Sequence, residues 1–125
     1  MNNNTLYKIV TRAEWQTAQQ TGSIPLSPTD VKDGFIHLST ADQYITSANL
    51  YFNPEDQPLV IELDGKRLTG DVRWEWSDQR QADFPHLYGG ALRLSAANAT
   101  VSLHATKDGY MIQSRTIIHP SGKPR

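Results

Sequence analysis

The sequence predicts an α+β fold in which two helices near the N-terminus pack on a mostly antiparallel β-sheet. Three observations lead to this prediction. The 125 residues contain no cysteine, and their number suffices for one hydrophobic core without disulfides. Helix-start signals follow residues 10 and 39, and short β-favouring runs separated by turn signals fill the second half. We therefore expect one domain over residues 6–114, between flexible ends at 1–5 and 115–125.

Charge and composition exclude several classes of function. Twelve basic and thirteen acidic residues are interleaved along the chain, so duplex nucleic acid is not an expected partner. Residues 1–5 have no basic and apolar leader pattern, and no apolar run approaches the length of a membrane span. We expect a cytoplasmic protein without a membrane partner. A ligand the size of a nucleotide remains compatible with this charge balance.

The first helix has clear start and stop signals. A β-favouring run at residues 6–10 precedes Thr11 and Glu14, whose spacing is that of a capping box. The helix should begin there, use Trp15 as its main apolar contact, and end at Gly22. Residues 23–32 contain two prolines and are expected to form an ordered loop that crosses the molecule.

A short apolar run at residues 35–39 follows Gly34 and contains His37. Side chains alternate along a strand, so Phe35, His37 and Ser39 should share one face, with the core on the other face. His37 is then either a half-buried structural histidine or a ligand-facing one. The hydroxyl groups of Ser39 and Thr40, where the strand ends, favour the ligand-facing alternative.

The second predicted helix begins at another capping box, formed by residues 40–43. Tyr44, Ala48 and Tyr51 follow helical spacing, and Asn53-Pro54 should stop the helix. Packing on the sheet is the simplest role for these aromatic side chains. Tyr44 alone is kept as a residue at the rim of a site.

The second half of the chain predicts the rest of the sheet. Residues 59–63 are almost continuously apolar, which is typical of a central strand buried on both faces. In the next strand Trp74 and Trp76 should lie on the core face, while Arg73 and Glu75 emerge side by side. Strands at 92–94, 100–105 and 110–112 complete the sheet, and disorder is expected from His119 onward.

Residues 84–90 place a proline and two glycines around His86 and Tyr88, which favours a positioned functional loop over a plain connection. Packing of this loop into the core is the alternative. We expect His86 to face the same cleft as His37, with the two rings within about 12 Å, because one small ligand would have to reach both.

The candidate site therefore combines cationic, hydroxyl and carboxylate groups from distant segments. His37 and Glu75 are the candidate catalytic residues. The candidate ligand-binding residues are Ser39, Thr40, Tyr44, Arg73, His86 and Tyr88. Arginine, hydroxyls and a protonatable histidine can hold ribose and phosphate oxygens, Tyr88 can stack on a base, and Glu75 can stabilise an oxocarbenium-like centre.

Two alternatives stay open for these residues. Arg73 and Glu75 could form an ordinary solvated or paired strand face. His37, His86 and Glu75 supply two imidazoles and a carboxylate, but their sequence spacing is not that of a close metal-ligand motif, so no metal is assigned.

The chain resembles the bacterial family called domain of unknown function 952, or DUF952. The resemblance rests on two specific motifs, residues 33–39 (DGFIHLS) and 84–89 (FPHLYG), together with residues 6–9, Trp15, Gly22 and residues 59–60. The family is similar in element order to the ADP-ribosyltransferase superfamily, in which an NAD-like ligand lies between two small sheets. Residues 35–39 also look like a strand of RNA 2′-phosphotransferases, where a histidine meets a phosphate or ribose.

The resemblance implies a split sheet and a small-molecule ligand such as NAD or ADP-ribose. It implies an enzyme that transfers or hydrolyses an ADP-ribosyl or phosphoribosyl group, with NAD as a substrate and no certain cofactor. A non-catalytic module that binds a small nucleotide or metabolite is the alternative. The chain departs from those enzymes at Lys8-Ile9, where they usually carry a histidine, and their late catalytic Glu or Gln has no certain counterpart.

Overall fold

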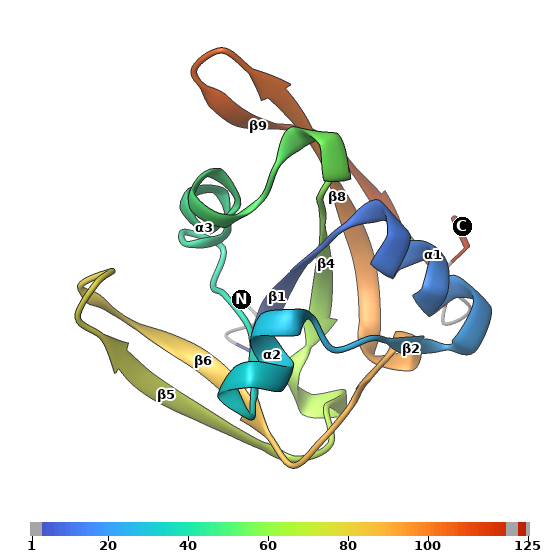
Figure 1. The fold of residues 1–125 in the computed structure, drawn as a ribbon. Helices are drawn as coiled ribbons and strands as arrows, with labels where there is room; N and C mark the ends of the chain where they lie inside the picture. Colours follow the sequence, from blue (N-terminus) through green and yellow to red (C-terminus); the bar gives the residue numbers. More distant parts are fainter. Residues whose placement is uncertain (1–3, 120–122, 125) are drawn as a thin grey trace.

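The main sheet has four antiparallel strands in the order β1-β4-β8-β9 (Figure 1). These strands are β1 (Thr5–Val10), β4 (Leu59–Asp64), β8 (Ala97–Thr106) and β9 (Gly109–Ile117). The computed structural model describes residues 4–119, 123 and 124. The predicted central strand is confirmed as β4, where Val60, Ile61 and Leu63 are fully buried between β1 and β8. The nearly continuous apolar character of β4 suits burial on both faces, and the intervening Glu62 is paired with Arg115.

A second sheet of three strands has the order β3-β6-β5 and is also antiparallel. It consists of β3 (Ile36–His37), β5 (Asp71–Ser77) and β6 (Ala82–Tyr88). The hairpin of β5 and β6 extends away from the main sheet in Figure 1. A short pair, β2 (Ser23–Ile24) with β7 (Leu92–Arg93), completes the described sheets. The α+β class and the largely antiparallel pairing are therefore confirmed.

The first helix, α1 (Arg12–Thr21), matches its prediction closely. The Glu14 amide donates to the Thr11 hydroxyl over 3.1 Å, and the Thr11 amide donates to the Glu14 carboxylate over 2.9 Å. Gly22 ends the helix with φ 82°, a left-handed conformation that glycine adopts without a Cβ penalty. Local sequence alone accounts for both ends.

The loop predicted at residues 23–32 is wrong in its second half, where the chain forms helix α2 (Pro28–Asp33). Ser27 caps this helix, and Asp30 completes a capping box. Pro28 at the first helical position lacks an N–H that would be unpaired there in any case. The two prolines favour an ordered loop by local preference, but Pro28 at the first helical position favours the helix.

The third helix, α3 (Tyr44–Tyr51), begins one turn later than predicted. Only half of the expected capping box forms, because the Gln43 side chain accepts from the Thr40 amide over 3.0 Å while Gln43 itself is the N-cap. The predicted stop is confirmed, since α3 ends at Tyr51 and Asn53 caps a 3₁₀ turn. The 3₁₀ turns are Pro54–Asp56, Gly65–Arg67 and Leu94–Ala96.

The functional loop predicted at residues 84–90 is instead mostly strand β6. The carbonyl of Pro85 accepts from the Leu38 amide, just past the end of β3. The backbone N and O of Pro85 both point to that side, so its pairing with Trp74 on β5 requires no N–H from the proline. The missing N–H therefore falls where the ladder with β3 stops. The glycines at 89 and 90 follow the strand as a turn.

The tryptophans predicted in the core are exposed, Trp74 by 53% and Trp76 by 58%. They lie on the same strand as Val72, which packs against the core through its partner Leu87. The hairpin extends beyond the elements that cover Val72, so alternation continues without a core to face. The expectation of a buried tryptophan face is wrong for this reason.

The end of the main sheet lies beyond the boundary expected at residue 114. Strand β9 continues through Arg115, which pairs with Glu62 on β4, and Ile118 is buried. At the other end Thr5 already belongs to β1. Within the tail expected to be disordered, Ile118 forms an isolated antiparallel bridge with Pro124. Residues 1–3, 120–122 and 125 of the expected flexible ends lie outside the described residues.

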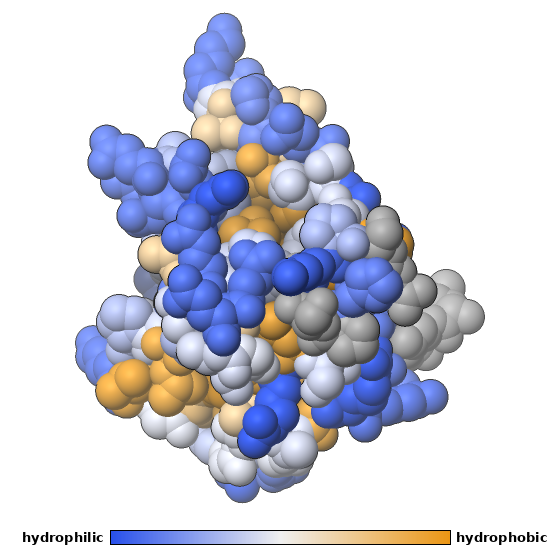
Figure 2. Space-filling model, turned by 90° about the vertical axis from the view of Figure 1, so that its right-hand side faces the viewer, coloured by the Kyte–Doolittle hydropathy of each residue, from blue (hydrophilic) through white to orange (hydrophobic). Residues whose placement is uncertain are grey.

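The outer surface is mixed in polarity. Figure 2 shows the face toward the right of Figure 1, where hydrophobic residues form separate small groups between hydrophilic ones. No helix within the described part of the chain has the length and apolar character of a membrane span.

Candidate functional site

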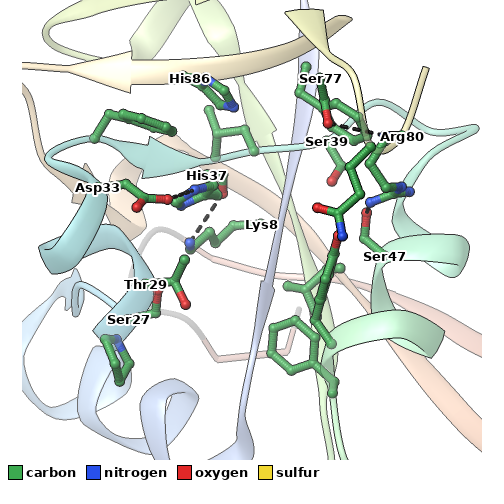
Figure 3. A pocket seen from close by; sticks show the side chains of 18 of the residues that line it. Lys8, Ser27, Thr29, Asp33, His37, Ser39, Ser47, Ser77, Arg80 and His86 are labelled. Atoms are coloured by element: carbon green, nitrogen blue, oxygen red, sulfur yellow. Dashed lines mark hydrogen bonds and ion pairs between the residues drawn. The ribbon is translucent and has the colours of Figure 1, made fainter. Parts of the chain in front are cut away.

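A cleft of about 770 Å³ opens between the two larger sheets, with walls from α2, β3, β6 and α3. Lys8 and Ile9 of β1 form part of its lining, and an aromatic set contributes apolar surface: Phe35, Tyr51, Phe52 and Phe84. Volumes of this size are typical of sites for small molecules. Figure 3 shows polar side chains on two sides of it, His37 and His86 on one and Arg80 on the other.

His37 is held between two carboxylates. Its Nδ1 lies 2.7 Å from Asp30 Oδ1, and its Nε2 lies 2.9 Å from Asp33 Oδ2. A neutral imidazole carries one N–H, so it can donate to only one carboxylate, whereas the imidazolium form donates to both. Both acids come from α2, the helix that the sequence interpretation missed. The side chain of His37 remains one third exposed to the cleft.

Asp30 is the buried centre of this network. Its side chain is fully buried and also bonds Lys8 Nζ at 2.8 Å, and the amides of Ser27 and His37 donate to it. Burial would raise the pKa of Asp30, but the hydrogen bond from His37 and the charge of Lys8 outweigh it and hold that pKa well below its usual range. The carboxylate is therefore ionised and fixes His37 in place.

His86 is oriented from behind by Glu75. Its Nδ1 lies 2.8 Å from Glu75 Oε1, and the Tyr88 hydroxyl donates to the same oxygen over 2.6 Å. The hydrogen bond from Tyr88, and to a smaller extent that from His86, lowers the pKa of Glu75. The same bond to Glu75 raises the pKa of Tyr88. No described residue bonds His86 Nε2, so this nitrogen is available at the cleft.

The two histidines converge as predicted, with ring centroids 5.5 Å apart. Phe35 contacts both rings, 4.1 Å from His86 in a stacked arrangement and 4.6 Å from His37. Antiparallel pairing of β3 with β6 places His37 directly opposite His86, which explains their proximity. One small ligand can reach both imidazoles.

Of the other predicted site residues, one lines the cleft and the rest do not. Ser39 lines the cleft and is buried. Glu75 and Tyr88 lie behind His86, and Arg73 stacks over Tyr88 at 4.4 Å while pairing with Asp71. None of these three is among the residues that line the cleft.

Thr40 and Tyr44 also lie outside the lining of the cleft. Thr40 is half-buried, and its amide donates to the Gln43 side chain in the turn before α3. The rim position expected for Tyr44 is wrong, because the ring is buried against Tyr7 with centroids 5.0 Å apart. The simpler packing role of this aromatic residue therefore holds.

Several lining residues had no predicted role, namely Lys8, Asp33, Ser47 and Arg80. For Asp33, the capping box at residues 27–30 was the missed signal, because a helix there brings both of its acids to His37. No local pattern marks Arg80, whose position depends on the length of the β5–β6 hairpin. Within the part of the chain that the structure describes, no three histidine or acidic side chains are placed to hold a metal ion.

The chain belongs to the DUF952 family. The family model, described as "Protein of unknown function (DUF952)", matches residues 9–100, which include both histidine segments. This finding confirms the family to which the sequence motifs point. No curated protein matches the chain.

Solved structures of one bacterial protein are similar to this chain. The crystal structure of CC0527 from Caulobacter crescentus has 35% sequence identity and a TM-score of 0.74, covering 87% of this chain and 93% of that chain. The solution NMR structure of CC0527 has 34% identity and a TM-score of 0.70, with coverage of 86% and 90%. The fold is thus shared with an experimentally determined structure.

Proposed function

We propose that the cleft binds a small nucleotide-type ligand that carries ribose and phosphate groups, such as ADP-ribose or NAD. The observation that carries this proposal is the convergence of His37 and His86 in one cleft, with ring centroids 5.5 Å apart. The protonated Nε2 of His86 and the Ser39 hydroxyl can donate to ribose or phosphate oxygens, whereas His37, with both nitrogens bonded to Asp30 and Asp33, offers its exposed ring as contact surface. Phe35 beside them offers an aromatic face to a base or nicotinamide ring.

The rigidity of the site supports binding by a preformed surface. Asp30 and Asp33 hold both nitrogens of His37, and Glu75 holds one nitrogen of His86. A ligand therefore meets side chains whose rotamers are already fixed, which lowers the entropy cost of binding.

An enzyme that transfers or hydrolyses an ADP-ribosyl or phosphoribosyl group is the second candidate. It is favoured by the Glu75–His86 pair, in which a carboxylate orients an imidazole and leaves Nε2 free to accept a proton from a nucleophile. In this candidate Glu75 is a positioning residue, because it bonds His86 and does not line the cleft. His86 takes the role of general base.

Calorimetric titration with ADP-ribose and with NAD tests the proposal. The informative variant is His86→Asn, because an asparagine amide can keep the bond to Glu75 at the position of Nδ1 while lacking Nε2. Arg93→Gln is the matched control, since Arg93 is exposed on β7 and does not line the cleft. We expect saturable binding to the wild type and the control, and weaker binding to His86→Asn.

Absence of saturable binding of both compounds to the wild type would contradict the proposal. Release of nicotinamide from NAD, followed by chromatography, separates the two candidates. Release by the wild type and its loss in His86→Asn support the enzyme, whereas binding without release supports the binding module.

A further inference from the structure

Arg80 lies on the side of the cleft opposite the two histidines (Figure 3). It sits in the turn between β5 and β6, whose backbone is fixed locally. The Arg80 amide donates to the Ser77 hydroxyl over 3.2 Å, and the Gln81 amide donates to the Ser77 carbonyl over 2.7 Å. The position of this arginine is therefore set by the hairpin turn.

The guanidinium of Arg80 is held between α3 and β6. Its Nη1 donates to the Ser47 hydroxyl over 2.9 Å, and its Cζ lies 4.7 Å from the centre of the Phe84 ring and 5.7 Å from that of Tyr51. Stacking on aromatic rings orients a guanidinium without using its N–H donors. A guanidinium has five such donors, and the bond to Ser47 uses one of them.

No carboxylate neutralises Arg80 within the described residues. Arg67, Arg73 and Arg115 each pair with an aspartate or glutamate, whereas Arg80 is half-buried and has no ion pair there. A partly desolvated cation is stabilised when an anion binds beside it. This arrangement is what an arginine needs to bind an oxyanion from solution.

We propose that Arg80, together with the Ser47 hydroxyl, forms a phosphate-binding subsite of the cleft. The subsite rests on the proposed function for its biological ligand, because it would receive a phosphoryl group of the nucleotide while His37 and His86 contact the ribose end. Ser39 lies between the two sides in Figure 3. The ligand class is thereby narrowed to compounds whose phosphoryl group is separated from the part held by the imidazoles.

A purely structural role is the competing explanation, in which Arg80 only ties the hairpin to α3. The two explanations differ in their response to anions. A structural tie affects the melting temperature alone, whereas a subsite makes phosphate binding depend on the guanidinium.

NMR titration with inorganic phosphate tests the subsite directly. The variants are Arg80→Gln, which removes the charge, and Arg80→Lys, which keeps it without the planar fork. Arg93→Gln removes the same charge from an exposed position on β7. In the wild type and Arg93→Gln we expect saturable shifts of the amides of Ser47 and residues 77–81.

In Arg80→Gln we expect phosphate binding to weaken about ten- to hundredfold, as for loss of a charge-assisted hydrogen bond, and in Arg80→Lys to weaken less. Equal affinity of Arg80→Gln and Arg93→Gln would overturn the subsite, and so would wild-type shifts confined to the histidine side. The amide spectra of each variant without phosphate show whether it is folded. If Arg80→Gln is unfolded, Ser47→Ala takes its place, and unchanged phosphate affinity in Ser47→Ala would overturn the subsite.

Titration with ADP-ribose and adenosine separates this inference from the proposed function. ADP-ribose binding that depends on His86 but not on Arg80 would overturn the subsite alone. Phosphate binding at Arg80 without binding of either ADP-ribose or NAD would overturn the nucleotide proposal and leave the subsite standing. If the nucleotide proposal and the phosphate subsite are both correct, Arg80→Gln weakens the binding of ADP-ribose. It leaves the binding of adenosine, which lacks a phosphate, unchanged.

Discussion

The Nδ1 atom of His86 lies 2.8 Å from Oε1 of Glu75, on the neighbouring strand of the hairpin. The same oxygen accepts from the Tyr88 hydroxyl, so one carboxylate holds two side chains. Glu75 therefore supports the histidine and does not itself line the cleft.

Glu75→Gln should lower the pKa of Tyr88 toward the ordinary tyrosine value. The pKa is raised because the neutral hydroxyl donates to the Glu75 carboxylate and because a nearby negative charge opposes ionisation. A neutral amide provides a weaker acceptor and no charge. Tyrosinate absorbance is titrated in the wild type and in Glu75→Gln, each with and without the additional change Tyr88→Phe. The difference within each pair gives the titration of Tyr88. An unchanged Tyr88 titration would mean that the Glu75–Tyr88 bond is absent in solution.

His37→Ala should reduce both stability and ADP-ribose binding. The change removes a hydrogen-bond donor from the buried Asp30 carboxylate, which costs about 1–3 kcal/mol of the free energy of unfolding. His37→Asn keeps a donor near the position of Nδ1, so it should recover most of the stability, but it lacks the ring that is exposed to the cleft, so binding should stay weakened. Urea unfolding and calorimetry give the two quantities. Full ADP-ribose affinity in His37→Ala would remove His37 from the site.

Asp30 should make the stability depend on acid pH. Its pKa is lowered in the folded state, so its stabilising effect is fully present above the unfolded value near 4 and is lost as pH falls toward the folded pKa. Melting temperature should therefore drop steeply below about pH 4 in the wild type. Asp30→Asn should flatten that drop. At neutral pH it should cost about 3–5 kcal/mol, because Lys8 is left buried without its partner.

Trp74→Ala should leave stability nearly unchanged, within about 0.5 kcal/mol, because the indole is 53% exposed. Leu87→Ala, on the adjacent strand, should cost about 2–5 kcal/mol, because Leu87 is 1% exposed and packs in the main core. Chemical denaturation of both variants makes the comparison. A larger loss for Trp74→Ala would show that the hairpin packs on the body of the protein.

Much of the fold could be predicted because its signals act within a few residues. The caps at Thr11 and Gly22 satisfy helix ends from the next turn, and the nearly continuous apolar run at residues 59–63 is typical of a strand buried on both faces. The helix at Pro28–Asp33 has an equally local signal in the capping box of Ser27 and Asp30, but the two prolines of this segment also favour a loop. The convergence of the two histidine segments on one cleft was predicted from their polar and turn residues, but their direct strand pairing was not.

The sequence by itself determined the class of fold, the family, and the face of its strand that His37 occupies. Only the tertiary structure decided which side chains meet in the cleft. The bond between His86 and Glu75 depends on strand register, and the contact between Arg80 and Ser47 depends on how far the hairpin extends over α3. Neither is specified by neighbouring residues, since a shift of one residue in register reverses the face of every side chain.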